Sequence, residues 1–306
     1  MKKEYFELEQ GRFYYEVSGE ALGIVAYQGN SSELKIPGEI MGKPVKFIGK
    51  KAFLSCKGLK KVVIPKQIES LEDWAFANCN FLEEAEFVSA DLHLGKGVFQ
   101  GCKVLKSILV PTRYISDEEQ ERQIGALLAA AINLLDAPHL FSIGEAGSIE
   151  WLNQWDAKLL QFLKEDDREG FTVVVLCGEE DYGSDENSLS YFLKQKRKSK
   201  VRLSFLRLLN PVGISTETRT VLTEYLRSHT KGCPWEETWQ VVLEEHGNEK
   251  CYYEILTECG CVTKENFQGF LQDLEGNYPE MKAFLMKYKE MNLGYEDFFD
   301  SLSLDL

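Results

Sequence analysis

Three cysteines, Cys56, Cys79 and Cys102, stand at a constant step of 23 residues. Thiolates are good zinc ligands, but a structural zinc site needs four ligands that converge on one point. Thiols that recur once per repeat lie along a column instead. The spacing therefore predicts reduced, buried thiols stacked on one side of a repeating fold, with no metal site.

Histidines offer no better chemistry. None of the four stands in a metal-ligand spacing with another His or Cys; they are His93, His139, His229 and His246. The chain has no phosphate loop of the Gly-Lys-Ser/Thr type, no Gly-x-Ser-x-Gly elbow and no dinucleotide-binding glycine motif. We therefore expect no catalytic, cofactor or metal site and a protein that is not an enzyme.

Two local clusters have simpler interpretations than a site. The carboxylates of 179–187 lack the spacing and the terminal Glu of an EF-hand, which favours an exposed acidic loop over a calcium site. Cys259-Gly260-Cys261 has one residue between the thiols, whereas the redox motif has two. The pattern predicts a helix end at Gly260, with the flanking thiols packed inward.

The elements that position these residues repeat. The pattern Ile48-Gly49-x-x-Ala52-Phe53-x-x-Cys56-x-x-Leu59-x-x-Val62-x-Ile64-Pro65 recurs at 71–87 and 94–111 with the same step. A fixed period of this length is typical of a solenoid, in which each coil buries its apolar face on the next. We expect Phe53, Phe76 and Phe99 to stack as an aromatic column.

Residues that alternate with the inward ones should face outward from the predicted strands. They form a small mixed surface, which is either a solvated face or a protein-binding face. Its members are Lys61, Val63, Glu84, Glu86, Ser107 and Leu109.

The repeat resembles the BspA-like leucine-rich repeat, the Treponema pallidum type, over about residues 12–111. The opening stretch 36–45 resembles the first coil of that family. The resemblance implies a curved β-solenoid used for protein recognition, often at a cell surface. Glu72 replaces the family glycine, and Ala85 and Phe87 replace Val and Ile, so we expect the second coil to be distorted.

The start of the chain predicts a cap. Residues 11–30 have the pattern of a β-hairpin, which would cover the open end of the first coil. Residues 1–7 carry charges where a signal peptide is apolar, and no run approaches the about 18 apolar residues of a membrane span. We expect a cytoplasmic protein without membrane insertion, or a surface or secreted one if a leader has been removed.

The period becomes helical after residue 115. Ser116-x-x-Glu119 has the pattern of a capping box before the first helix. The sequence predicts two domains, a leucine-rich repeat solenoid at 1–115 and an acidic α-helical domain at 116–306, in an α+β multidomain fold. The predicted helices are 117–135, 148–164, 186–209, 217–229, 236–246, 249–259, 264–275 and 279–291.

Two features of the helical half stay open. A βαβ unit at 171–208 is the alternative to helices, because 172–176 has strand propensity. Residues 236–291 weakly resemble ankyrin-like helix pairs. The tail 298–306 is apolar enough to be a docking segment, either as a cap on the last helices or in a groove of another protein.

Charge and aromatic residues bear on partners. Residues 116–306 carry 19 Lys and Arg against 35 Asp and Glu, so this half repels phosphate backbones and excludes nucleic acid as a partner. Trp235 and Trp239 belong to an aromatic patch that either fills the core or meets a partner.

We expect a non-enzymatic protein–protein interaction module with a partner of unknown identity. The alternatives are a surface adhesin or virulence-type protein, and an enzyme with its site in a βαβ unit at 171–208.

Overall fold

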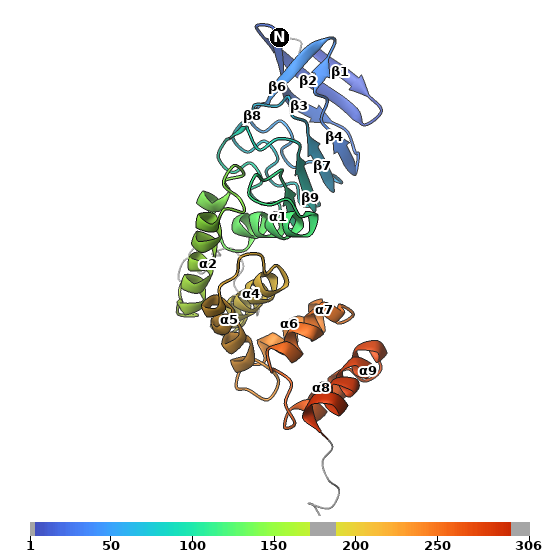
Figure 1. The fold of residues 1–306 in the computed structure, drawn as a ribbon. Helices are drawn as coiled ribbons and strands as arrows, with labels where there is room; N and C mark the ends of the chain where they lie inside the picture. The colour runs from blue at the N-terminus through green and yellow to red at the C-terminus, as the bar shows by residue number, and fades with distance from the viewer. Residues whose placement is uncertain (1–3, 172–187, 295–306) are drawn as a thin grey trace, which may run out of the picture. The chain divides into compact units, whose positions relative to one another are not determined.

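The computed structural model describes residues 4–171 and 188–294 (Figure 1). The chain forms two compact units. The first comprises residues 1–161 with 210–214, and the second comprises 162–209 with 215–306. The domain boundary predicted after residue 115 lies inside the first unit.

The first unit begins with an antiparallel sheet. β2 (Gly11–Ser18) and β3 (Ala21–Gln28) form the predicted hairpin, and β1 (Glu4–Leu8) adds a strand that the sequence did not indicate. β3 then pairs in parallel with β6 (Lys43–Ile48), so the hairpin joins the solenoid through backbone hydrogen bonds. The sheet continues through two short strands, β8 (Ser70–Leu71) and β10 (His93–Leu94), and β5 (Glu39–Ile40) pairs with β6.

A second sheet runs along the solenoid and is parallel throughout. Its order is β11 (Ser107–Leu109), β9 (Glu84–Phe87), β7 (Lys61–Ile64) and β4 (Glu33–Lys35). One row of inward side chains crosses all four strands in register, and each member is 1% exposed or less. These residues are Leu34, Val62, Ala85 and Ile108. The predicted β-solenoid is confirmed.

The second coil is regular, so the expected distortion is wrong for its strand. β7 and β9 pair from Lys61–Glu84 to Ile64–Phe87 without a register shift. The ring of Phe87 is buried and lies edge-on to Phe99, at 6.2 Å between ring centroids. A large side chain thus fills the space beside the small Ala85.

The aromatic column forms as predicted. Phe53 and Phe76 stack at 4.7 Å between centroids, and Phe76 and Phe99 at 5.7 Å. The column is longer than the repeat pattern indicated, because Tyr27 stacks on Phe53 at 5.2 Å and Phe141 meets Phe99 edge-on at 5.8 Å. Residues outside the repeat therefore cover both ends of the column.

The three repeat cysteines form a column beside the rings. Cys79 Sγ donates to Phe53 O at 3.2 Å, and Cys102 Sγ donates to Phe76 O at 3.1 Å. Both side chains are buried, whereas Cys56 is half-buried. The hydrogen bond between the thiols of Cys79 and Cys102 raises the pKa of Cys79 to about 12. The contact with Cys56 acts against this shift, and burial adds to it.

The solenoid ends on a helix at the end opposite the hairpin (Figure 1). α1 (Glu118–Asn133) packs on β11, the last strand of the parallel sheet. Its N-cap is Asp117, whose carboxylate accepts from Gln120 N at 3.0 Å, and not Ser116 as the capping-box pattern suggested. η1 (Pro138–Leu140) and α2 (Ile149–Lys164) complete the unit.

The second unit is helical. α4 (Leu189–Leu209) packs against α5 (Thr216–Ser228), α6 (Glu237–Glu245) and α7 (Lys250–Glu258). α8 (Phe267–Asp273) and α9 (Pro279–Tyr288) follow, and the π-helical turn η3 (Lys289–Leu293) ends the described chain. The eight predicted helices are therefore confirmed, with ends that differ by at most three residues.

The βαβ alternative is wrong in the part that can be judged. Its second strand, 201–208, lies inside α4. The reason is that the apolar residues of this stretch recur at helical spacing and pack on three neighbouring helices. Its first strand, the acidic loop 179–187 and the apolar tail 298–306 lie outside the described residues. The resemblance of 236–291 to ankyrin-like pairs stays a prediction.

Candidate functional site

The outward face of the parallel sheet carries the first group of predicted site residues. Lys61 Nζ lies 2.5 Å from Glu84 Oε1 and 3.2 Å from Glu86 Oε2. The hydrogen bond to Glu84 raises the pKa of Lys61 above its ordinary value. Lys61 thus pairs with both carboxylates, and the three side chains lie beside Val63, which is half-buried. The parallel register thus brings the four residues together, as the alternation predicted.

The same face extends to β4, from which no site residue was predicted. Glu33 pairs in register with Lys61, and Lys35 pairs with Val63, so both side chains lie in the outward rows. The signal was present in the sequence, because Leu34-x-Ile36-Pro37 has the same spacing as Val62-x-Ile64-Pro65 at the end of the next coil. Its outward neighbours follow from the same alternation.

Ser107 and Leu109 have a different environment from the other predicted face residues. Helix α1 lies against them at Gly125. An added Cβ on Gly125 would stand 2.8 Å from Ser107 Oγ, 3.1 Å from Ile108 O and 3.2 Å from Leu109 Cδ2. Glycine therefore lets the helix backbone approach the edge of β11 closely. The most open part of the candidate face is formed by β4, β7 and β9.

The two tryptophans predicted as site residues have different environments in the second unit. Trp239 is 1% exposed and packs edge-on to Phe270, with centroids 4.5 Å apart. Its Nε1 donates to Asp273 Oδ2 at 2.7 Å, and Lys231 Nζ donates to the same oxygen at 2.8 Å. Burial acts to raise the pKa of Asp273, but these two hydrogen bonds outweigh it and hold the pKa below its ordinary value. Trp239 thus belongs to the core.

Trp235 remains at the surface, with 51% of its area exposed. The Arg197 guanidinium lies 4.2 Å from the centre of the Trp235 ring system, which is a cation–π distance. The cation holds one face of the indole in place and leaves the rest to solvent. A fixed, exposed indole is the kind of side chain that dominates many protein interfaces.

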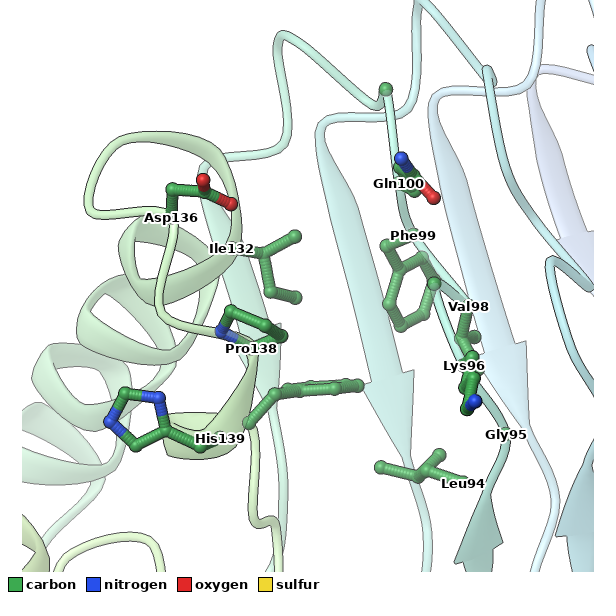
Figure 2. Close-up of a pocket in the computed structure, with 13 residues that line it drawn as sticks. Leu94, Gly95, Lys96, Val98, Phe99, Gln100, Ile132, Asp136, Pro138 and His139 are labelled. Carbon is green, nitrogen blue, oxygen red and sulfur yellow. The ribbon is translucent and has the colours of Figure 1, made fainter. Parts of the chain in front are cut away.

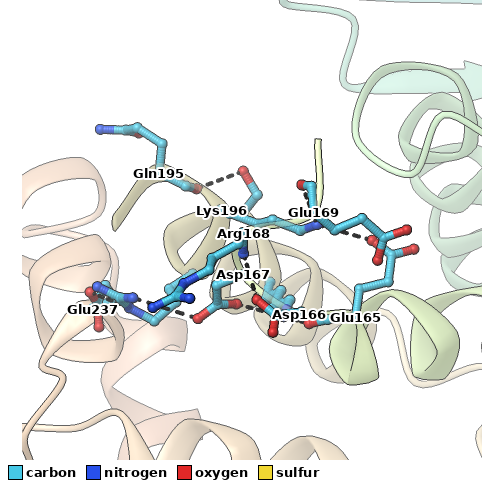
Figure 3. Close-up of polar contacts among 11 residues, drawn as sticks. Glu165, Asp166, Asp167, Arg168, Glu169, Gln195, Lys196 and Glu237 are labelled. Carbon is cyan, nitrogen blue, oxygen red and sulfur yellow. Dashed lines mark hydrogen bonds and ion pairs between the residues drawn. The ribbon is translucent and has the colours of Figure 1, made fainter. Parts of the chain in front are cut away.

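Sequence reasoning missed a charge cluster around Arg197, the cation that contacts this indole (Figure 3). Arg197 Nε donates to Glu237 Oε1 at 2.8 Å, and Arg197 Nη1 lies 3.5 Å from Asp167 Oδ2. Lys200 Nζ donates to Asp167 Oδ1 at 2.7 Å. Arg197 and Lys200 are both buried. The basic run of α4 is therefore an internal partner for acidic residues of the same unit.

Two further pairs continue this pattern along α4. Lys198 Nζ lies 2.5 Å from Glu244 Oε2, and Arg202 donates to both carboxylate oxygens of Glu245 at 2.7 and 2.8 Å. The sequence did contain a signal, because six Lys and Arg residues fall within 194–202 in an otherwise acidic half. Paired basic side chains offer little positive surface to a phosphate backbone.

A pocket of about 610 Å³ lies at the end of the solenoid (Figure 2). One wall is the loop of the last coil, residues 94–101. The other wall is formed by Ile132 in the last turn of α1, by Asp136 beyond the end of that helix, and by Pro138, His139 and Phe141 around η1. No residue of this pocket was predicted as a site, because the second wall comes from outside the repeat.

The helix end predicted at Gly260 is present in the structure. Gly260 adopts φ +67° directly after α7, and Cys259 and Cys261 are buried on either side of it. The seven described cysteines are free. Within 4–171 and 188–294, no three His, Cys, Asp or Glu side chains gather as metal ligands would. The described helices also include none long and apolar enough to span a bilayer.

Residues 27–120 match the BspA type leucine rich repeat region in six copies. Three solved structures are similar over about a third of this chain. A leucine-rich repeat protein from Bacteroides capillosus is 24% identical, with 33% of this chain and 78% of that chain covered and a TM-score of 0.30. A leucine rich cell surface protein from Faecalibacterium prausnitzii is 21% identical, with 37% and 33% covered and a TM-score of 0.30.

The third is a leucine rich repeat protein from T. pallidum, which is 20% identical over 32% of this chain and 69% of that chain, with a TM-score of 0.24. This chain thus spans only a third of the length of the Faecalibacterium protein. No curated protein matches the chain.

Proposed function

Since residues 27–120 are a BspA-type leucine-rich repeat region, we propose that the chain is a non-enzymatic protein-binding module. The surface that meets the partner is the outward face of β4, β7 and β9. The observation that supports this proposal most is the register of that face. It places Lys61, Glu84 and Glu86 in one ion-paired cluster beside Val63.

Such a face fits protein recognition for a physical reason. Solenoids bind through long side-chain rows of fixed spacing, which need no induced rearrangement. Charges held by their neighbours supply orientation and discrimination between partners, while an aliphatic centre supplies the area that is dried on binding. The apolar contribution comes from Val63, and the rim comes from the charged residues around it.

The test uses paired capture with the full-length chain. Val63→Glu and Lys61→Glu should release a partner that the wild type retains from extracts of the native organism, as identified by mass spectrometry. Lys57→Glu is the matched control, because Lys57 is an exposed lysine outside the strands of the sheet. Circular dichroism must show the same spectrum for all variants. A partner retained equally by all four proteins would rule out this face.

Trp235 is a second contact point within the same proposal. Its indole is exposed and held by Arg197, so a partner would dry a rigid aromatic surface at low entropic cost. Trp235→Ala should weaken capture of a partner that uses the second unit, by about tenfold or more if the indole is a hot spot. The adhesin alternative and the expected cytoplasmic location stay predictions.

A further inference from the structure

Consecutive coils of the solenoid are joined by a row of backbone hydrogen bonds on the side opposite the parallel sheet. Phe53 N donates to Ala75 O at 2.8 Å, and one coil later Phe76 N donates to Val98 O at 2.9 Å. The residues two positions before and after each Phe make the same bond. In every coil, therefore, alternate N–H groups point toward the next coil.

The last coil has the corresponding N–H donors, but no described residue supplies acceptors for them. Its donors are the N–H groups of Gly97, Phe99 and Gly101, which correspond to those of Trp74, Phe76 and Asn78. None of the three has a hydrogen-bond partner among the described residues. Gly97 and Gly101 are half-buried, and Phe99 is 1% exposed. A buried N–H without an acceptor is rare and costly in a folded protein.

These donors lie at the pocket of about 610 Å³ at the end of the solenoid. In Figure 2, Val98, Phe99 and Gln100 stand on one side of the pocket, and Ile132 and Pro138 stand on the other. The volume lies in the range of sites that bind ligands. The pocket therefore combines an apolar wall with a row of donors that have no acceptor within residues 4–171 and 188–294.

We propose that this pocket binds an extended peptide segment of a partner protein. Carbonyl groups of that segment accept from Gly97, Phe99 and Gly101, and an apolar side chain packs between Ile132 and Phe141. The inference goes beyond the proposed function, because it uses none of the residues of the sheet face.

The spacing of the donors selects a peptide as the occupant. An extended chain presents carbonyl groups to one side at every second residue, which matches donors at three alternate positions. The solenoid itself shows the match, since the row at Trp74, Phe76 and Asn78 is satisfied by the carbonyls of 96, 98 and 100.

A second copy of the chain is a poor occupant. The corresponding carbonyls of its inner coils already accept from their own neighbours, as Ala75 O does from Phe53 N. Occupation by a coil of another copy would require these bonds to break. A segment from a different protein can supply free carbonyls.

The experiment uses a peptide that carries the right acceptors. The probe is a synthetic copy of residues 92–102 with Cys102→Ser, because this segment satisfies the same row one coil earlier. A peptide of the same composition in scrambled order is the control. Amide hydrogen exchange of the full-length chain is followed by NMR. We expect the amides of Gly97, Phe99 and Gly101 to exchange about tenfold more slowly with the probe, as one ordinary hydrogen bond gives.

A variant pair locates the effect. Ile132→Trp fills the pocket and should abolish the protection. Leu134→Trp, two residues away at the end of α1 and 42% exposed, lies outside the pocket lining and should leave the protection unchanged. A thermal melt of each variant confirms that it is folded.

Four results would overturn the proposal. The three amides could already be protected in the free protein, or show no change at millimolar probe. Protection that appears with rising protein concentration alone would assign the pocket to a second copy. Equal protection by the scrambled peptide would show that the contact is not specific. Loss of capture through the sheet face would not affect any of these readouts, so the two proposals fail separately.

Discussion

Phe76→Ala tests the aromatic column most directly. Phe76 is fully buried, and it is the central ring, with Phe53 at 4.7 Å on one side and Phe99 at 5.7 Å on the other. Replacing a buried Phe by Ala costs about 3–5 kcal/mol, of which the lost ring contacts are a part. This is a large share of the about 5–15 kcal/mol that stabilises a typical domain.

The expected loss converts into a measurable shift. With a urea dependence of about 2 kcal/mol/M, a loss of about 4 kcal/mol lowers the midpoint by about 2 M. Because the chain has two units, unfolding is followed by hydrogen-exchange mass spectrometry on peptides from residues 45–111. Phe81→Ala is the control, since Phe81 is 56% exposed in the same coil and should lose less than about 0.5 kcal/mol. Equal shifts for the two variants would refute the column as a stabilising element.

Three other tests probe the cap, the thiols and the second unit. Gly125→Val should lower the melting temperature, although valine is the better helix former. Gly144→Val is the control and should not lower it, because a Cβ at Gly144 meets nothing within 4 Å. Similar melting temperatures for the two variants would argue against close packing of α1 on β11. In the native protein at pH 8, Cys79 should react with a maleimide at least tenfold more slowly than the exposed Cys251, because Cys79 is buried and its pKa is about 12. In urea the two thiols should react at similar rates. The pKa of Asp273 is lowered on folding, so its contribution to stability is present at neutral pH and is lost as pH falls through the folded pKa, below the ordinary value of about 3.9. Asp273→Asn should therefore reduce thermal stability at pH 7 by more than at pH 3, and an equal loss at both would contradict the assigned hydrogen bonds.

The repeating part of the fold could be predicted from the sequence because each coil imposes the same demands. Phe53, Phe76 and Phe99 occupy one position of the repeat, so a constant step suffices to place them in one column. The outward residues Lys61 and Glu84 follow from strand alternation in the same way. The regular spacing alone specifies which residues lie in one column and which face outward.

The ends of the solenoid could not be predicted in this way. Tyr27 and Phe141 extend the aromatic column, but neither lies at the repeat step from its neighbour. Gly125 gives α1 its close approach to β11, yet the sequence shows only a glycine inside a helical pattern. Such contacts depend on how nonrepeating segments turn back onto the coil, which single-sequence periodicity does not report.

The second unit shows a comparable limit for charge. The net charge of the helical half predicts that nucleic acid is not a partner, but this sum does not reveal the basic run at 194–202. Residues of that run are paired with Asp167, Glu237 and Glu244, which lie far apart in the sequence. Net charge sums over residues regardless of position, whereas burial and pairing depend on which helices pack together.

The two ends of the solenoid also differ in how they satisfy the backbone. At the first end, β3 continues the hydrogen bonding of the coils, and Tyr27 N donates to Ala52 O at 3.0 Å. At the last end, α1 packs on β11, and the ring of Phe141 packs on the ring of Phe99. These contacts provide apolar cover on both sides of the coil, but they leave the N–H of Phe99 without an acceptor among the described residues. A helix and a ring can bury apolar surface without supplying carbonyl groups, because helical carbonyls are used within the helix. The N–H groups of the last coil thus lack acceptors because a helical element, and not another coil, covers this end of the solenoid.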